Sequence, residues 1–130
     1  MKVLLADGDH EFRDTVRKFF EGTLCEISYA YNIDVALQIM KENTESRFDF
    51  VVVSWSLPHE SGERLVKTIR RFYVGQRVWV TYPSVGKTPE KIGTGIFNDL
   101  LKQNINRYNI FPEEELIPRL KSELDGYLQR

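Results

Sequence analysis

The stretch VVVSWSLPHESG, from Val51 to Gly62, decides how the rest of the chain is interpreted. It begins as a run of apolar β-branched residues, which is typical of a strand buried on both faces, and it ends in a turn that contains Pro and Gly. Ser54 stands where the strand ends. Ligand chemistry in parallel sheets gathers at the carboxyl ends of the strands, so Ser54 occupies a place where a functional side chain is expected.

Short apolar runs alternate with amphipathic segments along the whole chain. Apolar residues recur at helical spacing after Asp9, the expected N-cap of a first helix, and a second helix is expected to begin near Asn32. Pro118 should divide the last helix into two pieces. The predicted strands are 2–6, 25–30, 48–54, 77–81 and 105–111, each followed by a helix. Because these connections are too long for hairpins, we predict an α/β fold with a doubly wound, five-stranded parallel sheet.

Length and charge narrow the class of protein. The 130 residues suffice for a single domain, 1–130, with one core. Lys and Arg number 18 against 19 Asp and Glu, and the formal net charge of -1 provides no global field for nucleic acid or an anionic membrane. No apolar stretch approaches the roughly 18 residues of a membrane span, and the single Cys25 cannot form an internal disulfide. We therefore expect a cytoplasmic protein in which Cys25 is a small core residue.

Two segments of the chain resemble a known family. VLLADGDHEFR (3–13) and FDFVVVSWSLPHESG (48–62) are similar to the receiver domain of bacterial two-component response regulators, and the similarity covers essentially the whole chain. The resemblance implies a flavodoxin-like fold and a role in signal transduction. Family members carry a phosphorylated Asp followed by Pro and Gly, and here Ser54, Pro58 and Gly62 stand at that spacing. The loop is retained and the acceptor is replaced, so the chain resembles a degenerate member, a pseudo-receiver.

The resemblance also assigns the other positions of the phosphorylation site. Asp7 matches the first acid of the family's pair, whereas Gly8 stands where the second acid, a metal ligand, belongs. Asp9 is either a helix cap or a displaced metal ligand. Thr81 matches the hydroxyl that holds the phosphoryl group, although Tyr82 follows where the family has a small residue. Because Mg²⁺ depends on carboxylate ligands, we expect no cofactor and weak or absent Mg²⁺ binding.

The family's Lys has two candidate positions. Counting back from FPEEELIPRL (111–120), which resembles the start of the family's last helix, places Tyr108 at the Lys position. Lys102 has the family's Gly-to-Lys spacing in GIFNDLLK (95–102), but periodicity predicts a helix there, so we prefer Tyr108. Under either alignment the phosphorylation site is incomplete.

These substitutions predict a module that is not an enzyme and that binds a protein independently of phosphorylation. A serine hydroxyl is a weak nucleophile without an adjacent base, and both histidines, His10 and His59, lie in predicted loops. In the family, the fourth helix and fifth strand often bind partners. That favours a surface that includes Lys102, Ile105 and Arg107, bound by a signalling protein or by a second copy of the chain. Neither nucleic acid nor a membrane is expected to bind.

Two alternatives from other functional classes stay open. A phosphorylatable receiver could use another acid, of which Glu60 and Asp49 are the nearest, yet neither lies at the exit of the strand. TYPSVGKT (81–88) nearly matches the phosphate-binding loop of nucleotide hydrolases, but Thr81 replaces the first Gly of that loop and only one predicted strand follows.

Three aromatic residues lie near the predicted strand ends. Trp55, Trp79 and Tyr82 could stack on a ligand, but large aromatic side chains more often fill space in a core. We therefore expect them to pack into the pocket that the lost acceptor leaves.

Overall fold

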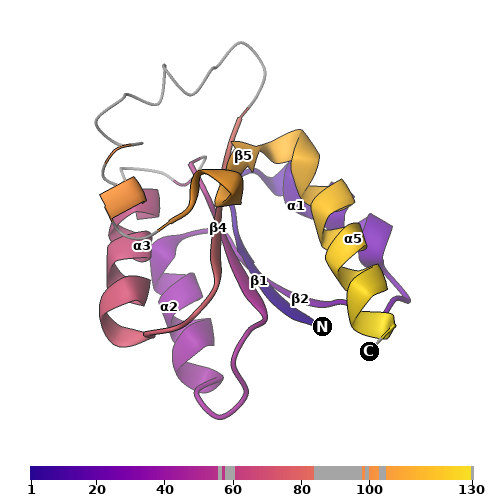
Figure 1. Cartoon of the computed structure of the whole chain (residues 1–130), viewed down its shortest axis with the longest axis horizontal. Coiled ribbons are helices and arrows are strands. Elements are labelled where there is room, and N and C mark those ends of the chain that lie inside the picture. Colours follow the sequence, from indigo (N-terminus) through magenta and orange to yellow (C-terminus); the bar gives the residue numbers. More distant parts are fainter. Residues whose placement is uncertain (56, 58–60, 84–97, 99, 103–104, 130) are drawn as a thin grey trace.

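The computed structural model describes residues 1–55, 57, 61–83, 98, 100–102 and 105–129, in which five parallel strands form one sheet. The strands lie in the order β2-β1-β3-β4-β5. They are β1 (Lys2–Ala6), β2 (Glu26–Ala30), β3 (Phe50–Ser54), β4 (Val78–Tyr82) and β5 (Ile110–Pro112). Helices α1 (His10–Phe20) and α5 (Leu116–Leu128) cover one face, and α2 (Ile33–Glu42) and α3 (Ser61–Phe72) cover the other (Figure 1). The predicted doubly wound, flavodoxin-like parallel sheet is confirmed.

The helices begin where the sequence predicted. The Asp9 side chain accepts hydrogen bonds from the first amides of α1, and the Asn32 side chain accepts one from Val35 N at 2.8 Å to cap α2. The last helical region has two pieces, a 3₁₀ turn over Glu113–Glu115 and then α5. Pro118 lies in the first turn of α5, where a missing amide proton removes no helical hydrogen bond.

The face of the sheet under α2 and α3 is the larger of the two cores. Alternate strand residues, such as Leu4, Val51 and Val80, pack there against Ile33 and Ile69. These strands are apolar on both faces, as expected for a sheet that helices cover on both sides.

The face under α1 and α5 carries the other core. Phe50, Trp79 and Phe111 pack there with Leu116 of α5. Cys25 belongs to this core with 6% of its surface exposed, which confirms its prediction as a core residue. Burial raises the pKa of its thiol to about 11, so the sulfur is a neutral thiol at physiological pH.

The fifth strand is shorter and later than the predicted 105–111. Residues Arg107–Asn109 form a 3₁₀ turn, and the strand covers only Ile110–Pro112. The Asn106 side chain accepts a hydrogen bond from Tyr108 N at 3.0 Å, and Asn106 O accepts one from Asn109 N at 2.8 Å. Asn side chains compete with strand pairing in this way, and the turn displaces the first half of the predicted strand.

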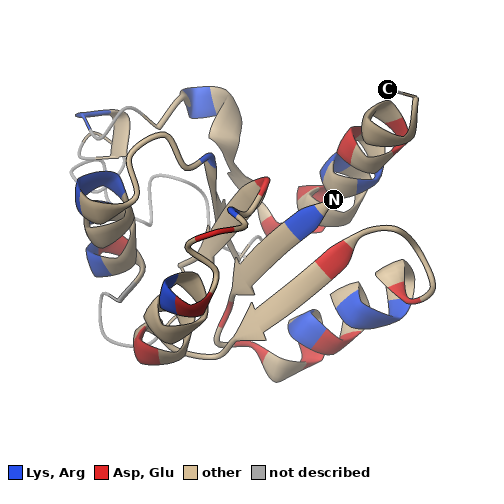
Figure 2. Cartoon of the chain, turned by 90° about the horizontal axis from the view of Figure 1, so that it is seen from below, with Lys and Arg blue, Asp and Glu red and all other residues tan. Residues whose placement is uncertain are grey.

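Charges of both signs are mixed over the helices (Figure 2). Ion pairs such as Lys18–Asp14 at 3.1 Å and Lys67–Glu63 at 3.0 Å join residues one helical turn apart. Such exposed pairs contribute only about 0.3–0.5 kcal/mol each. Within the part of the chain that the structure describes, no helix combines the length and the apolarity needed to cross a bilayer.

Candidate functional site

The candidate site lies where β1, β3 and β4 end side by side. Ala6 is paired with Val53, so Asp7 follows β1 beside Ser54, and Ser54 is paired with Thr81. All three polar side chains are fully buried. The structure therefore brings Asp7, Ser54 and Thr81 together, as the sequence predicted, because the carboxyl ends of parallel strands meet at one edge of the sheet.

The turn after β1 holds Asp7 in place. Asp7 N donates to Ala30 O at 2.9 Å, and Arg13 reaches back from α1 to donate to Asp7 O at 2.6 Å. Asp7 Oδ1 accepts a hydrogen bond from Asp9 N at 2.8 Å. Gly8, between the two acids, is exposed and supplies no side-chain oxygen.

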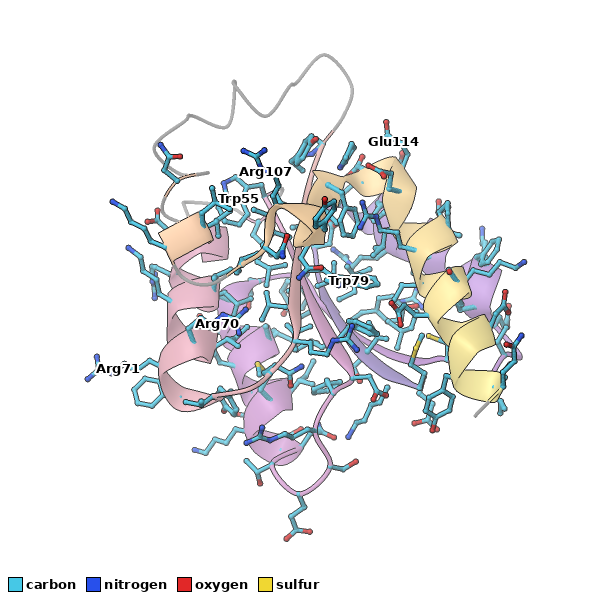
Figure 3. The ribbon with its side chains drawn as sticks, viewed as in Figure 1. Trp55, Arg70, Arg71, Trp79, Arg107 and Glu114 are labelled. Atoms are coloured by element: carbon cyan, nitrogen blue, oxygen red, sulfur yellow. The ribbon has the colours of Figure 1, made fainter. Side chains whose placement is uncertain are left out.

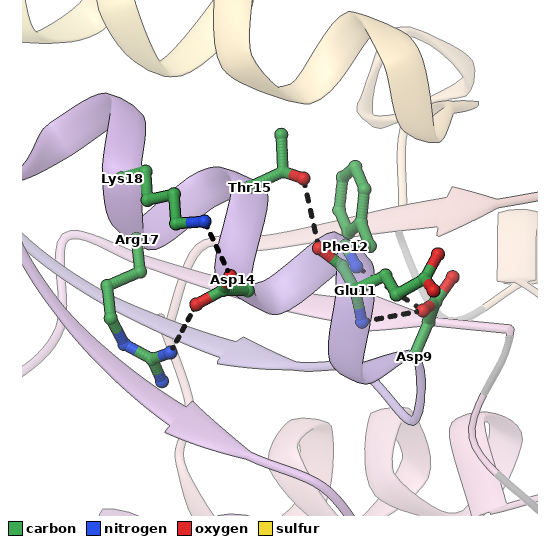
Figure 4. A network of polar contacts seen from close by, with 7 residues as sticks. All are labelled: Asp9, Glu11, Phe12, Asp14, Thr15, Arg17 and Lys18. Atoms are coloured by element: carbon green, nitrogen blue, oxygen red, sulfur yellow. Dashed lines mark hydrogen bonds and ion pairs between the residues drawn. The ribbon is translucent and has the colours of Figure 1, made fainter.

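The Asp9 side chain is directed to α1 (Figure 4). Its Oδ1 accepts hydrogen bonds from Glu11 N at 3.0 Å and from Phe12 N at 3.3 Å, which confirms the predicted helix cap. Of the two possibilities that the sequence left open for Asp9, the structure thus shows the cap.

The ends of β3 and β4 are joined by backbone hydrogen bonds. Trp55 N donates to Thr81 O at 2.9 Å, and Leu57 N donates to Ser54 O at 3.2 Å in the turn that follows. Thr81 Oγ1 is buried and has no hydrogen-bond partner among the described residues. The Thr81 hydroxyl thus lies at the carboxyl end of β4, where the sequence predicted it.

The ring of Trp55 closes the site toward α3. A Cβ atom added to Gly62 would lie 3.0 Å from Trp55 Cε3 and 3.4 Å from Ser54 O. This contact is tighter than ordinary van der Waals packing, so the first turn of α3 approaches β3 this closely only with glycine at position 62. Packing alone therefore explains why position 62 is glycine, whether or not the domain is phosphorylated.

The aromatic residues do not form the single cluster that the sequence predicted. Trp55 and Tyr82 pack with the core under α2 and α3, whereas Trp79 lies in the core under α1 and α5. Figure 3 shows the indole of Trp55 on the α3 side and that of Trp79 on the α5 side. Trp79 and Tyr82 point to opposite faces of the sheet because they are three positions apart on one strand, and side chains alternate between the two faces. Burial, followed by Glu115 and Glu114, raises the pKa of Tyr82.

Glu113 is a residue of the site that the sequence analysis missed. It follows β5 directly, next to Pro112, which is paired with Tyr82. Burial raises the pKa of Glu113, and the charges of Asp7, Asp9 and Glu114 raise it further. A further acid therefore lies near Asp7.

Tyr108, the preferred equivalent of the family's Lys, is placed elsewhere. It lies in the 3₁₀ turn before β5, at the amino end of that strand, and 76% of its surface is exposed. Because the site is at the carboxyl ends of the strands, the prediction that Tyr108 belongs to it is wrong. The other candidate, Lys102, lies in a helical segment and is exposed, as periodicity indicated.

The predicted partner surface needs one correction. Ile105 is 1% exposed and belongs to the core under α2 and α3, so its side chain cannot contact a partner. Lys102 and Arg107 are exposed. Ile105 instead anchors the segment before β5 in this core.

The alternative acceptors and ligands can be placed only in part. Asp49 lies at the amino end of β3, opposite to Ser54, and accepts a hydrogen bond from Lys2 N at 2.8 Å. Glu60, His59 and the phosphate-loop-like residues 84–88 lie outside the described residues. In the described part of the chain, no group of three or more His, Cys, Asp or Glu residues is arranged to hold a metal ion. Of the positions that the resemblance assigns to acids, Asp7 carries a carboxylate, whereas Gly8 and Ser54 carry none.

Solved structures with this fold are receiver domains from several organisms. The receiver domain of the Francisella response regulator 1452 has 23% identity, covers 97% of this chain and 98% of its own, and superposes with a TM-score of 0.68. The signal receiver domain of an HD domain-containing protein from Pseudomonas fluorescens Pf-5 has 16% identity, coverage of 99% and 98%, and a TM-score of 0.70. These likenesses show the fold.

A third similar structure contains a modified residue and ligands. It is a response regulator from Burkholderia pseudomallei with a phosphorylated aspartic acid, a calcium ion and citrate. It has 18% identity and a TM-score of 0.67, and the match covers 98% of this chain and 71% of that one. No curated protein sequence matched the chain. The profile of the response regulator receiver domain matches residues 3–107, most of the chain, which therefore belongs to the response regulator receiver domain family.

Proposed function

We propose that this receiver domain is a phosphorylation-independent protein-interaction module in signal transduction. The observation that carries the proposal is Ser54, a fully buried serine at the end of β3, where the receiver family places its phosphorylated Asp. A neutral serine hydroxyl is a weak nucleophile, so a serine at this position is a poor phosphate acceptor. In this proposal the domain is not an enzyme, it needs no cofactor, and its affinity for Mg²⁺ is weak or absent.

Two further features support the loss of phosphorylation. Gly8 brings no oxygen to the position of the second acid. Glu113, which follows β5, brings a further acid near Asp7. A phosphoryl group with its negative charge would be repelled by these carboxylates.

The test of this part is treatment with a small phosphodonor. The protein is incubated with acetyl phosphate and Mg²⁺, and its intact mass is compared with that of a receiver domain that has a complete site. We expect no added phosphoryl mass and no saturable heat of Mg²⁺ binding by calorimetry. A base-labile adduct on the wild-type chain would overturn the proposal and favour the phosphorylatable alternative.

The partner in this proposal is a protein that contacts the exposed surface at Lys102 and Arg107. The partner is a signalling protein or a second copy of the chain, and sedimentation of the purified protein distinguishes these two. Lys102→Glu and Arg107→Glu should each weaken capture of the partner, because both change the sign of an exposed charge. Such exposed changes alter the unfolding free energy by only about 0.5 kcal/mol.

The matched control for the partner surface is Lys41→Glu. Lys41 is an exposed residue in the last turn of α2, so its reversal changes the net charge by the same amount at another surface. Capture that is weakened equally by the control and by the Lys102 and Arg107 variants would place the interface elsewhere.

A further inference from the structure

Three aromatic rings that contact one another under α1 and α5 have an arginine at each end of the row. Phe50 and Trp79 have ring centroids 4.2 Å apart, and those of Trp79 and Phe111 are 5.5 Å apart. The guanidinium of Arg77 lies 4.2 Å from the ring centroid of Phe50, and that of Arg119 lies 4.1 Å from that of Phe111. Stacking on a buried ring orients a guanidinium plane and restricts the motion of its side chain.

Both arginines line one cavity at the amino ends of β4 and β5. The cavity has a volume of about 180 Å³, and it is also lined by Trp79, Tyr108, Asn109 and Ser122. It lies at the end of the sheet opposite to Asp7, Ser54 and Thr81, so it is separate from the site of the family's chemistry. Its walls come from β4, the turn before β5, and α5.

The two guanidinium groups are held in place while donors remain available. Arg119 donates to Tyr108 O at 2.6 Å and lies 3.3 Å from Glu115 Oε1. Arg77 stacks on Phe50, and its guanidinium has no hydrogen bond or ion pair with any described residue. A guanidinium that is oriented by stacking and has its hydrogen-bond donors free is prepared to bind an oxyanion.

We propose that this cavity binds the phosphate group of a small phosphate monoester. Arg77 supplies the free forked donors, and Arg119 adds a second positive charge from the other side of the cavity. Asn109 and Ser122 add uncharged donors, and the exposed ring of Tyr108 offers a surface for the rest of the ligand. Glu123, the one acid of the lining, accepts a hydrogen bond from a hydroxyl or amino group of the same ligand, which favours a monoester over a polyanion.

The test is a titration followed by NMR. Backbone amides, the Trp79 indole and the arginine Nε–H groups are observed while ribose 5-phosphate or inorganic phosphate is added at constant ionic strength. We expect saturable shifts confined to the residues that line the cavity, which include Arg77, Trp79, Tyr108, Asn109, Arg119 and Ser122. Arg77→Gln should weaken the apparent affinity about tenfold or more, because it removes a charge-assisted pair of hydrogen bonds.

The matched control is Arg71→Gln. Arg71 stacks on Phe72 at 5.2 Å, but both residues are exposed at the end of α3 and do not belong to the lining of this cavity. This variant should bind the phosphate probes as the wild type does. If Arg77→Gln proves unstable in thermal unfolding, Ser122→Ala and Arg77→Lys test the same contacts, and each should weaken binding several-fold.

The titrations distinguish a phosphate monoester from inorganic phosphate as the ligand. Tighter binding of ribose 5-phosphate than of inorganic phosphate supports the monoester, and equal binding assigns the cavity to phosphate itself. Shifts that sodium chloride reproduces, or an affinity unchanged in the Arg77 variants, would overturn the proposal. The result is independent of Ser54, because that residue lies at the other end of β3.

Discussion

Thr81 is paired with Ser54 where β4 and β3 end, and the side chains of both residues are fully buried. Asp7, equally buried, follows the neighbouring strand β1. A further carboxylate at this edge would lose its contact with water and lie near a like charge, and both effects disfavour its ionised form. The end of the sheet is therefore suited to neutral side chains at positions 54 and 81.

Ser54→Asp is expected to destabilise the fold more than Ser54→Asn. The two new side chains have nearly the same shape, so the difference between them isolates the charge. We expect the Asp variant to have an unfolding free energy lower by about 3 kcal/mol at neutral pH, the order of cost of an unpaired buried charge. Urea denaturation of both variants measures this difference.

The pH dependence gives the control for this prediction. Burial raises the pKa of a carboxyl group in the folded state above its unfolded value, so the folded state takes up the proton first as pH falls. The difference between the Asp and Asn variants should therefore shrink as pH decreases. Equal stabilities at neutral pH would mean that a cation compensates the charge at position 54.

Glu113→Gln is expected to stabilise the protein at neutral pH. Burial and the charges of Asp7, Asp9 and Glu114 raise the pKa of Glu113 above its ordinary value of 4.5, so its ionised form is disfavoured in the folded state. The carboxyl is partly exposed, and solvent screening limits the gain to about 0.5 kcal/mol. Thermal and urea unfolding as a function of pH measure it.

The raised pKa of Glu113 sets the pH range over which the Gln variant is the more stable protein. The cost of ionised Glu113 is fully present above its raised folded pKa, decreases as pH falls through that pKa, and disappears below 4.5. The advantage of the Gln variant should follow the same course. Glu45→Gln, a change at an exposed loop position, is the control and should show no such dependence. An advantage that persists in acid would point to packing as its cause.

The sequence predicted the fold well because the same pattern, an apolar strand followed by an amphipathic helix, recurs along the chain. Strands buried on both faces need continuous apolar runs, and β1, β3 and β4 have them, as in the run that ends at Ser54. The strand that departs most from the prediction is β5, which is three residues long and follows a turn capped by Asn106. Ile105, placed in that strand by the prediction, is a core residue of the preceding segment instead.

The candidate site was predictable where it follows long strands. Asp7, Ser54 and Thr81 each stand at the exit of a clear apolar run. Glu113 could not be found in this way, because its nearness to Asp7 depends on tertiary structure. The segments that lead into α1 and α5 turn to the same face of the sheet, and this brings Asp9 and Glu113 toward each other although β1 and β5 are not neighbours.

Gly62→Ala is expected to destabilise α3 despite the better helix propensity of alanine. The new Cβ would lie 3.0 Å from the ring of Trp55, and the rigid indole cannot move without displacing its core neighbours. We expect a loss of about 1–3 kcal/mol in the unfolding free energy. In a Trp55→Leu background the same change should cost much less. Urea denaturation of the wild type, the two single variants and the double variant gives the coupling free energy between positions 55 and 62.

Gly126→Ala provides the matched control for Gly62. Gly126 lies in α5, and nothing lies within 4 Å of the Cβ that alanine would add. Only the propensity term remains, so this variant should be more stable than the wild type by about 0.5–1 kcal/mol. If both glycine variants are stabilised, the close approach of Trp55 to α3 does not hold in solution.

Ser54→Asp alone is expected not to restore phosphorylation, because the site is deficient at several positions. The change returns a nucleophile and one metal ligand, but Gly8 still brings no oxygen and Glu113 still places an acid near Asp7. Each missing electrostatic support is worth ~2.7–4 kcal/mol of barrier, so the loss of two suppresses transfer by about 10⁴-fold or more if they act independently. Intact mass after incubation with acetyl phosphate and Mg²⁺ measures the labelling.

Two triple variants compare two positions for an introduced lysine. Both carry Gly8→Asp and Ser54→Asp, and the third change is Glu113→Lys in one and Tyr108→Lys in the other. Glu113 lies near Asp7, whereas Tyr108 lies at the amino end of β5, so only the Glu113 variant places its ammonium where the phosphoryl group forms. We expect labelling of that variant alone. Efficient labelling of Ser54→Asp by itself would contradict a deficiency spread over several residues, and equal labelling of the two triple variants would show that the cation is not required beside Asp7.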